Sequence, residues 1–266
     1  MPLPGGRAVS IARVLVIAGS DSGGGAGIQA DIRTISALGG HAMTAITAIT
    51  AQNTLGVTRV DLIDPAMVIA QIDAVLADIG ADAIKIGMIG SAAIADAVAD
   101  RLERADAPLV FDPVMAATSG AALADAATVA AFERLMRRAT VITPNLPELA
   151  LLAPDGAEAL ARRTGAAVLA KGGHGEGAML TDRLVTADGQ VREWTDARIE
   201  TRHTHGTGCT LASALATLLA QGRGLEEAVG EARAYVRRSI ETAPGLGKGN
   251  GPLGCGLSPI RRTSAS

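Results

Sequence analysis

A short glycine-rich segment, His205-Gly206-Thr207-Gly208-Cys209, has the residue types of an anion-binding site. It leads directly into a stretch of Ala and Leu that is typical of a helix. The first amides of a helix have no partner inside it, and together with the helix dipole they favour an anion such as a transferring phosphoryl group. The Walker pattern G-x-x-x-x-G-K-[ST] is absent, so this would be another kind of phosphate site. Cys209 would lie in the first turn, where its thiolate is favoured; the alternative is a glycine turn before a buried cysteine.

A second glycine-rich segment, residues 19–27, follows an apolar run and continues as Gly25-Ala26-Gly27-Ile28-Gln29-Ala30. This matches the G-x-G-x-x-A pattern of dinucleotide-binding proteins, which also place an acidic residue at the end of the second strand. That strand is expected to end in Thr50-Ala51-Gln52-Asn53, and the first acidic residue after it is Asp61. The sequence therefore disfavours a dinucleotide oxidoreductase. It leaves a plain turn, or a substrate loop that a ligand can approach closely.

The segment Thr143-Pro144-Asn145-Leu146-Pro147-Glu148 places oxygen ligands directly after an apolar strand. Asn145 and Glu148 could face one site and hold a hard cation that bridges phosphates, partly through water. In the alternative, Asn145 caps a helix that Pro147 begins. The two roles are compatible, because a capping Asn does not prevent Glu148 from reaching a metal.

Two single charged residues also follow apolar strands. Asp112 comes directly after Leu109–Phe111, and Lys171 comes directly after Val168–Ala170. Ligand sites in open α/β sheets collect at such strand ends, so Asp112 could assist the cation and Lys171 could face a phosphate. Either residue, taken singly, could equally be an ordinary loop charge. No spacing typical of a structural zinc site connects the histidines, which are His41, His174, His203 and His205.

The elements that must position these residues alternate along the chain. Short apolar segments predict strands at 14–18, 43–50, 83–86, 109–111, 140–142 and 168–170. Helical spacing of apolar residues predicts helices near 28–38, 68–79, 94–102, 207–221 and 225–242. Short strands at 178–181, 184–187 and 191–194, with the turn signal Asp188-Gly189, predict an antiparallel edge. We therefore predict an α/β fold with a mainly parallel central sheet and helices on both faces.

The composition favours one domain with a large core. The chain has 266 residues, 48% of them hydrophobic, and no charged or Pro-rich linker divides it. We expect a single domain over residues 1–266, with its core at about 14–243 and a Gly/Pro-rich tail at 244–266.

Charge and residue counts argue against several classes of function. With a formal net charge of −3 and no cluster of Lys or Arg, nothing indicates a nucleic-acid or membrane surface. Aromatic residues make up only 2%, so a stacking platform for bases is not expected. Cys209 and Cys255 show no disulfide framework, and the apolar run Val14–Ala18 is too short for the core of a signal peptide. We therefore expect a cytoplasmic protein.

Several segments, taken in order along the chain, match the pattern of one protein family. They are Ala18-Gly19-Ser20-Asp21-Ser22-Gly23-Gly24-Gly25-Ala26-Gly27-Ile28-Gln29-Ala30-Asp31, Thr50-Ala51-Gln52-Asn53-Thr54, Lys85-Ile86-Gly87-Met88, Asp112-Pro113-Val114-Met115, Thr143-Pro144-Asn145-Leu146-Pro147-Glu148, Lys171-Gly172-Gly173-His174 and Thr204-His205-Gly206-Thr207-Gly208-Cys209-Thr210. In this order they resemble the hydroxymethylpyrimidine/phosphomethylpyrimidine kinases of the ribokinase-like superfamily. The resemblance extends from about residue 14 to 240 and implies a three-layer α/β/α sandwich.

The resemblance also implies a reaction and roles for individual residues. ATP, with Mg²⁺, would phosphorylate 4-amino-5-hydroxymethyl-2-methylpyrimidine and then its monophosphate, giving the pyrophosphate used in thiamine biosynthesis. Gln52 would bind the aminopyrimidine edge, because an amide offers both a donor and an acceptor. The other implied roles are a ring pocket of Gly19, Met88 and Val114, an anion hole of Gly206, Thr207, Gly208 and Cys209, catalysis by Cys209, nucleotide contacts from Lys171 and Thr207, and Mg²⁺ binding by Asn145, Glu148 and Asp112. A homodimer is implied as well.

Other interpretations stay open at this point. A pyridoxal kinase of the same superfamily is a close rival, since some relatives share the Gly-Thr-Gly-Cys segment and both rings carry a hydroxymethyl group. A sugar kinase would be expected to carry Asp in place of Cys209, and a protein that binds pyrimidines without turnover is disfavoured by the intact anion-hole segment. Two features depart from the family pattern: residues 154–165 are short for the helix expected there, and Lys248 and Asn250 stand where histidines are expected.

Overall fold

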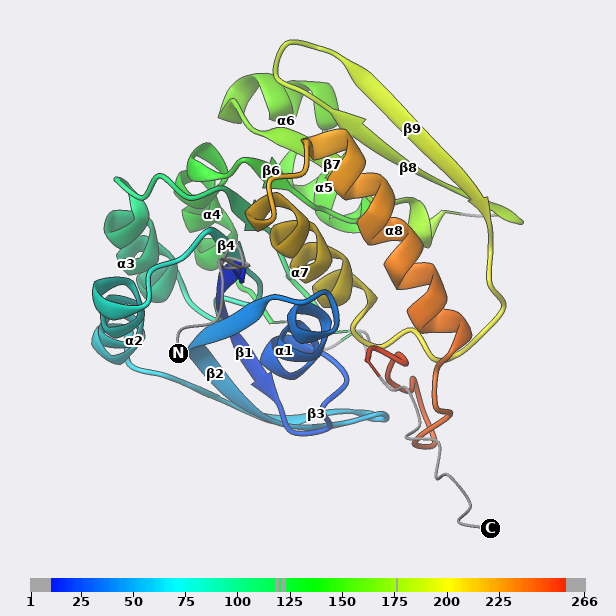
Figure 1. The fold of residues 1–266 in the computed structure, drawn as a ribbon, viewed down its shortest axis with the longest axis horizontal. Helices are drawn as coiled ribbons and strands as arrows, with labels where there is room; N and C mark the ends of the chain where they lie inside the picture. Colours follow the sequence, from blue (N-terminus) through cyan, green and yellow to red (C-terminus); the bar gives the residue numbers. More distant parts are fainter. Residues whose placement is uncertain (1–10, 118–119, 121–122, 176, 257–266) are drawn as a thin grey trace, which may run out of the picture.

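Nine strands form one sheet in the part of the chain that the structure describes (Figure 1). The computed structural model describes residues 11–117, 120, 123–175 and 177–256. The strands lie in the order β3-β2-β1-β4-β5-β6-β7-β8-β9. Their bounds are β1 Arg13–Asp21, β2 His41–Asn53, β3 Gly56–Leu62, β4 Ala83–Ile86, β5 Leu109–Phe111, β6 Val141–Ile142, β7 Ala167–Ala170, β8 Met179–Val185 and β9 Val191–Ala197.

The strands from β2 across to β7 pair in parallel, and both edges of the sheet are antiparallel. The parallel pairs are β1–β2, β1–β4, β4–β5, β5–β6 and β6–β7. The antiparallel pairs are β2–β3, β7–β8 and β8–β9. The carboxyl ends of the parallel strands therefore meet along one edge, where open α/β sheets bind their ligands.

Helices cover both faces of this sheet and complete the predicted three-layer sandwich (Figure 1). Their bounds are α1 Gly27–Ala37, α2 Pro65–Asp78, α3 Ala92–Leu102, α4 Ala126–Arg138, α5 Leu146–Leu152, α6 Ala157–Thr164, α7 Thr207–Ala220 and α8 Leu225–Glu241, with a short 3₁₀ turn, η1, at Gly172–His174. Successive strand residues face opposite layers: Val14 and Val16 pack with α1, α7 and α8, whereas Leu15 and Ile17 pack with α2, α3, α4 and α6.

Local sequence signals explain where several helices begin. Asp64 caps α2 by accepting a hydrogen bond from the amide of Ala66, and Pro65 occupies the first position of that helix. Ser91 and Asp125 cap α3 and α4 in the same way. The starts of these three helices are therefore specified by residues within or next to their first turn.

The predicted strands at 178–181 and 184–187 are wrong as separate elements. The structure has one strand there, β8, which pairs with β9 as the predicted antiparallel edge. Thr181, Asp182 and Arg183 look like a break in an apolar pattern, but an antiparallel strand with one solvated face accepts such residues. The opposite edge, β3, was not predicted, because most of its side chains are exposed and leave no hydrophobic pattern.

The tail after Pro244 has no helix or longer strand as far as Gly256, which agrees with the loop expected there. It nevertheless packs into the domain, because Leu253 is 2% exposed and Cys255 is 1% exposed. Its backbone forms an isolated bridge between Pro252 and His205. The folded domain therefore continues beyond the expected core boundary. None of the helices in the described residues is long and apolar enough to cross a membrane.

Candidate active site

A cavity of about 840 Å³ opens at the carboxyl ends of the parallel strands. The residues for which the sequence predicts a role all line it: Gly19, Gln52, Met88, Asp112, Val114, Asn145, Glu148, Lys171, Gly206, Thr207, Gly208 and Cys209. Most of them lie near the carboxyl end of a parallel strand or in the segment that follows it, which explains how positions so far apart in the sequence reach one place. The cavity is thus a single site, and what each residue does in it remains a prediction.

Gly19 and Gln52 lie where the regular pairing of their strands is interrupted. The register of β1 against β2 shifts between Ala18 and Ser20, and that of β2 against β3 shifts between Ala51 and Gln52. Such irregularities re-aim backbone and side chains and are common beside active sites. A Cβ atom on Gly19 would lie 3.1 Å from the Met88 sulfur, so glycine keeps this wall of the cavity thin.

The glycine-rich loop after β1 is organised by the carboxylate of Asp21, which is 3% exposed. Asp21 accepts hydrogen bonds from the amides of Gly23 at 2.8 Å, Gly25 at 3.0 Å and Ala26 at 2.8 Å. Amides that already bind a carboxylate are not available to a pyrophosphate. The structure therefore gives a physical reason, beyond the missing acid after β2, why this loop is not a dinucleotide site.

The start of α7 has the geometry of an anion site. Gly206 precedes the helix in the left-handed region at φ +88°, and a Cβ there would lie 2.0 Å from the carbonyl oxygen of Gly25. The helix has no side-chain cap. A Cβ on Gly208 would lie 3.3 Å from Asp112 Oδ2 and 3.4 Å from Lys171 Nζ. The first turn therefore presents bare backbone to the cavity beside a lysine, which suits a phosphoryl group.

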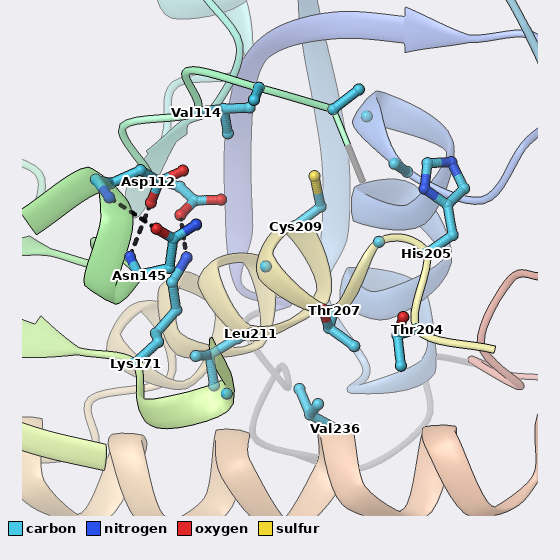
Figure 2. A pocket seen from close by; sticks show the side chains of 18 of the residues that line it. Asp112, Val114, Asn145, Lys171, Thr204, His205, Thr207, Cys209, Leu211 and Val236 are labelled. Atoms are coloured by element: carbon cyan, nitrogen blue, oxygen red, sulfur yellow. Dashed lines mark hydrogen bonds and ion pairs between the residues drawn. The ribbon is translucent and has the colours of Figure 1, made fainter. Parts of the chain in front are cut away.

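Cys209 lies in this first turn, between the Asp112–Lys171 side of the cavity and His205 (Figure 2). The prediction that its thiolate is favoured is wrong. Burial raises the pKa of Cys209 to about 11, and the charges of Asp31 and Asp112 act in the same direction, against the Lys85 charge and a backbone hydrogen bond from Gly27. Burial and the two carboxylates outweigh the stabilising effect of the helix start on the thiolate, so Cys209 is a neutral thiol near pH 7.

A buried ion pair holds α7 against the rest of the sheet. Lys85, at the end of β4, lies 2.8 Å from Asp31 of α1, and both side chains are fully buried. Ser213, one turn after Cys209 on α7, donates a hydrogen bond to Asp31 at 2.6 Å. These contacts join β4, α1 and α7 directly behind the site. Lys85 belongs to a motif that the sequence analysis noted, but no role was predicted for it.

Asp112 and Lys171 form the second charged group of the cavity (Figure 2). Lys171 Nζ lies 2.7 Å from Asp112 Oδ1, and the hydroxyl of Thr143 donates to the same oxygen at 3.0 Å. Burial acts to lower the pKa of Lys171, but the carboxylates of Asp112 and Glu148 outweigh it and raise that pKa, so the amine stays charged. A fixed cation thus lies beside the anion site.

Asn145 and Glu148 make the helix cap that the sequence offered as an alternative. Asn145 Oδ1 accepts from the Glu148 amide at 2.8 Å, and Glu148 Oε2 accepts from the Asn145 amide at 2.8 Å. Burial raises the pKa of Glu148, Lys171 lowers it and Asp112 raises it again. The cap is therefore built from a carboxylate that a further cation would stabilise.

The donor set fits Mg²⁺ held partly through water. The nearby carboxylate of Asp112 disfavours the charge of Glu148 and helps to raise its pKa, and a divalent cation would relieve this repulsion. Among the described residues, no group of three or more His, Cys, Asp or Glu side chains could hold a metal. Mg²⁺ commonly uses one or two carboxylates and takes its remaining ligands from water and phosphates.

The far end of the cavity contains residues to which the sequence analysis gave no role. Leu211, Val236 and Ile240 line it from α7 and α8. Arg233 lies 2.6 Å from Asp182 and 2.8 Å from Asp196, so α8 is tied to the hairpin of β8 and β9. Helical periodicity predicts the helix that carries Val236, Ile240 and Arg233, but the sequence does not show that one face of this helix lines the cavity.

The architecture and the site together define a class. A mainly parallel sheet covered on both faces, a glycine-rich helix start beside a lysine, and a cavity at the strand ends are the features of a small-molecule kinase with the ribokinase-like fold. A sequence model of the family described as phosphomethylpyrimidine kinase matches residues 21–254, and the chain belongs to this family.

Comparisons with known proteins agree. The hydroxymethylpyrimidine/phosphomethylpyrimidine kinase of Rhizobium meliloti is 51% identical over 90% of this chain and 95% of its own length. The multifunctional thiamine biosynthesis protein ThiED of Corynebacterium glutamicum is 41% identical over 97% of this chain, which spans only 36% of that longer protein.

The solved structures similar to this chain include both phosphomethylpyrimidine and pyridoxal kinases. The phosphomethylpyrimidine kinase of Clostridium difficile has a TM-score of 0.76 at 36% identity, covering 86% of this chain and 99% of the other. The pyridoxal kinase of Bacillus subtilis, solved as an ADP complex, has a TM-score of 0.84 at 31% identity, covering 92% of this chain and 97% of the other.

Proposed function

We propose that the chain transfers the γ-phosphoryl group of ATP to the hydroxymethyl group of 4-amino-5-hydroxymethyl-2-methylpyrimidine. It then phosphorylates the monophosphate, giving the pyrophosphate used in thiamine biosynthesis. One observation carries the proposal: a side-chain amide, an anion site with a thiol, and a lysine–carboxylate group line one continuous cavity. The 51% identity to a kinase named for both pyrimidines supports the same substrate.

The amide of Gln52 binds the ring through the adjacent amino group and ring nitrogen, one as donor and the other as acceptor. Gly19, Met88 and Val114 enclose the flat ring, and the missing side chain of Gly19 leaves room for it beside Met88. Binding at this end holds the hydroxymethyl group towards α7. Fixing the two reactants in this way converts a bimolecular step into an effectively unimolecular one, which accounts for much of the rate.

Phosphoryl transfer then depends on charge and position. The γ-phosphate lies on the amides of Gly206–Cys209, and Lys171 and Thr207 contact the phosphate chain of the nucleotide. The transferred group spreads its charge over three oxygens in a loose transition state, so fixed amides and a lysine stabilise it more than they stabilise the ground state. The substrate oxygen attacks in line with the leaving phosphate.

Cys209 acts as a hydrogen-bond partner that orients the attacking hydroxyl. With a pKa of about 11 it is a thiol and not a resting thiolate, so it is poorly placed to remove a proton before the attack. In a loose transition state the hydroxyl loses its proton late, which lowers the demand for a strong base.

Asp112, Asn145 and Glu148 are the residues that would hold Mg²⁺. At these residues the ion would supply positive charge that offsets the charge of the nucleotide's phosphates. The hydrogen bond from the Asn145 amide holds the Glu148 carboxylate in the capping box, so the carboxylate is oriented before the nucleotide arrives.

The test is ATP consumption by the purified protein with hydroxymethylpyrimidine, its monophosphate or pyridoxal, with the products identified by mass. Conversion of both pyrimidines to the pyrophosphate is the expected result. Tight pyrimidine binding without turnover of any compound would instead indicate a binding protein on a kinase scaffold.

A pyridoxal kinase is the second candidate, and the high structural similarity to the Bacillus subtilis enzyme favours it. Pyridoxal also carries a hydroxymethyl group on a ring of similar size, but it lacks an amino group beside a ring nitrogen. Turnover of pyridoxal alone would leave the phosphate chemistry in place and replace the substrate.

We also propose a homodimer in the cytoplasm. The edge strand β3 and its neighbour expose Ile49, Val60 and Leu62, which a second copy could cover. The two free cysteines fit a reducing compartment, and the cytoplasm also supplies ATP. Analytical ultracentrifugation tests the assembly: a single species at twice the chain mass is expected, and a monomer at micromolar concentration would contradict it.

A further inference from the structure

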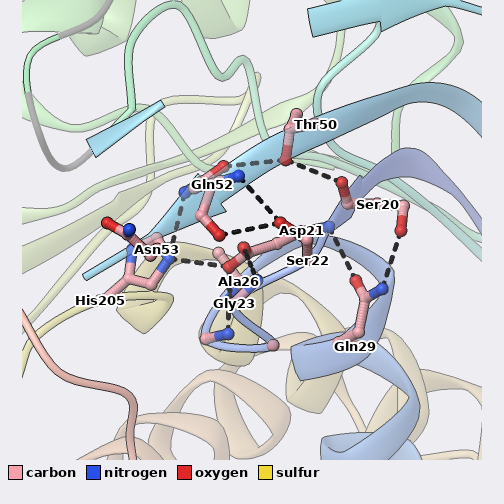
Figure 3. A network of polar contacts seen from close by, with 12 residues as sticks. Ser20, Asp21, Ser22, Gly23, Ala26, Gln29, Thr50, Gln52, Asn53 and His205 are labelled. Carbon is pink, nitrogen blue, oxygen red and sulfur yellow. Dashed lines mark hydrogen bonds and ion pairs between the residues drawn. The ribbon is translucent and has the colours of Figure 1, made fainter. Parts of the chain in front are cut away.

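The ring end of the cavity contains a polar network that crosses three segments of the chain (Figure 3). His205 Nε2 lies 2.8 Å from Asp21 Oδ2 and 3.2 Å from the Gln52 side-chain amide. The other end of that amide lies 3.2 Å from the Thr50 hydroxyl oxygen. Gln52 is therefore held at both ends of its amide by protein groups.

The His205 end of the amide faces a donor. Burial acts to raise the pKa of Asp21, but the hydrogen bonds from His205, Ala26 and Gly23 outweigh it and hold that pKa below its ordinary value. An ionised carboxylate can only accept, so the nitrogen 2.8 Å from it must carry a proton. This conclusion does not depend on the partner of the other ring nitrogen.

The Thr50 end of the amide faces an acceptor. The Thr50 hydroxyl lies 2.9 Å from the carbonyl oxygen of Ser20, which can only accept a hydrogen bond. A hydroxyl has one proton, and Thr50 donates it to Ser20. Towards Gln52, the Thr50 oxygen therefore offers a lone pair.

These two neighbours decide the orientation of the amide. An amide nitrogen at the His205 end would set two N–H donors against each other, and an oxygen at the Thr50 end would need a second hydroxyl proton. Nitrogen and oxygen of an amide have nearly the same shape, so the partners determine which is which. When the oxygen faces His205 and the nitrogen faces Thr50, the single Nε2–H of His205 is shared between Asp21 at 2.8 Å and the amide oxygen at 3.2 Å, and the amide nitrogen donates to the Thr50 lone pair. This is the reverse of the orientation drawn in Figure 3.

We propose that His205 is a positioning residue which, with Thr50, holds the Gln52 amide in this one orientation and so fixes the order of donor and acceptor that a ring must match. The proposal rests on the pyrimidine kinase function. A locked amide accepts a ring with an amino donor beside a nitrogen acceptor. The 4-oxo analogue 5-hydroxymethyl-2-methylpyrimidin-4-one has the reversed order, a carbonyl acceptor beside an N–H donor. Against the locked amide it sets acceptor against acceptor and donor against donor.

The position of His205 is itself fixed from several sides. A Cβ on Gly25 would lie 2.2 Å from His205 Cδ2, so the ring packs where only a glycine leaves room for it. The His205 amide donates to the carbonyl of Gly251 in the tail at 3.1 Å. The side chain is 6% exposed. A residue held this firmly can transmit its own orientation to Gln52.

The experiment compares kcat/KM for the 4-amino ring with that for the 4-oxo analogue. His205→Asn shortens the side chain out of reach of Gln52, and Thr50→Val removes the hydroxyl with little change of shape. We expect each variant to lower the amino-to-oxo ratio at least about tenfold, because a freed amide can turn to match the oxo ring. His205→Gln, which can place an amide nitrogen near the position of Nε2, should restore part of the ratio.

The ratio separates positioning from general damage. Disturbance of the neighbouring anion site slows both rings equally and leaves the ratio unchanged, and an unchanged ratio in both variants would overturn the proposal. If His205→Asn does not fold, Thr50→Val, which lies outside α7, decides alone. Absence of wild-type turnover counts against the proposed function, and the same ratio is then taken from Kd values measured by calorimetry.

Discussion

The two ends of the cavity treat their polar groups in opposite ways. At the ring end, formed by Ser20, Asp21, Thr50, Gln52 and His205, nearly every contact joins a donor to an acceptor of the protein itself. At the phosphate end, formed by Asp112, Glu148, Lys171, Gly208 and Cys209, two carboxylates share one lysine, and the helix start has no side-chain cap.

Under the proposed function, this difference reflects what each end of the cavity would bind. A small neutral ring offers few contacts, so affinity and selectivity depend on groups that are already fixed and lose little freedom on binding. A nucleotide brings several charges and a cation, so its site can leave charges and amides for the ligand to satisfy. We expect changes at the phosphate end to affect turnover most, and changes at the ring end to affect selectivity and stability.

Loss of Lys171 should have the largest effect. Lys171→Ala removes the positive charge beside Gly208. The carboxylates of Asp112 and Glu148 then have no lysine to offset their charge, so they repel the phosphates of ATP. We expect kcat/KM for ATP to fall about 10³-fold, with KM for the pyrimidine little changed. Steady-state kinetics at varied ATP measures this. Lys248→Ala, an exposed lysine in the tail, is the matched control, and equal kinetics in the two variants would remove Lys171 from the reaction.

Cys209 tests whether the thiol orients or removes a proton. Cys209→Ala should lower kcat about 10²-fold with little change in either KM, and Cys209→Ser should retain part of the rate because a hydroxyl can also orient the substrate. Since the thiol has a pKa of about 11, a thiolate base would make kcat climb about tenfold per pH unit towards that value. We expect no such climb between about pH 7 and 9.

The pH profile of Cys209→Ser completes this test. A steep rise in the wild type that the Ser variant lacks would show that the thiolate is the base and would break the assignment. Cys255→Ala is the control, because that thiol is buried against Thr210, outside the cavity lining.

Gln52 should control affinity for the ring alone. Gln52→Ala removes both hydrogen bonds to the aminopyrimidine edge. We therefore expect the KM for the pyrimidine to rise about tenfold, while the KM for ATP stays constant. The exposed Gln190→Ala in the β8–β9 turn serves as the control. An equal rise in both KM values would mean that the two ends of the cavity are coupled and not separate.

Much of the phosphate end could be predicted from the sequence because its signals are local. A glycine pair before a helix, an Asn three residues before a Glu, and charged residues after apolar strands each occupy a few consecutive positions. The parallel sheet then brings them to one edge without further information. The capping box of Asn145 and Glu148 is such a case, since both partners lie within one turn.

The rest could not be predicted because it depends on contacts between distant segments. His205 and Asp21 are 184 positions apart, and no local pattern relates them. The charge state of Cys209 was predicted wrongly because a helix start favours a thiolate, whereas the opposing burial and the charges of Asp31 and Asp112 come from other elements. The burial of Cys255 likewise could not be predicted, because a glycine-rich composition does not show where a tail packs.

The smallest effect, on stability and not on chemistry, tests whether the ring end is built in advance. Asp21 accepts from three loop amides and from His205, and an Asn would turn an N–H group towards at least one of these donors. Asp21→Asn should therefore lower the free energy of unfolding by about 2 kcal/mol at pH 7. Because the folded-state pKa of Asp21 is depressed, its contribution is present above the ordinary value of 3.8 and is lost as the pH falls through the lower folded value.

Urea unfolding of the wild type and Asp21→Asn between about pH 7 and 3 measures this difference, which should shrink towards the acid end. Asp61→Asn, an exposed carboxylate paired with Arg59 on β3, should change stability by less than about 0.5 kcal/mol throughout. If Asp21→Asn is as stable as the wild type at pH 7, then the loop is not held by its carboxylate. The ring end would then be organised by its ligand, as the phosphate end is, and the contrast between the two would disappear.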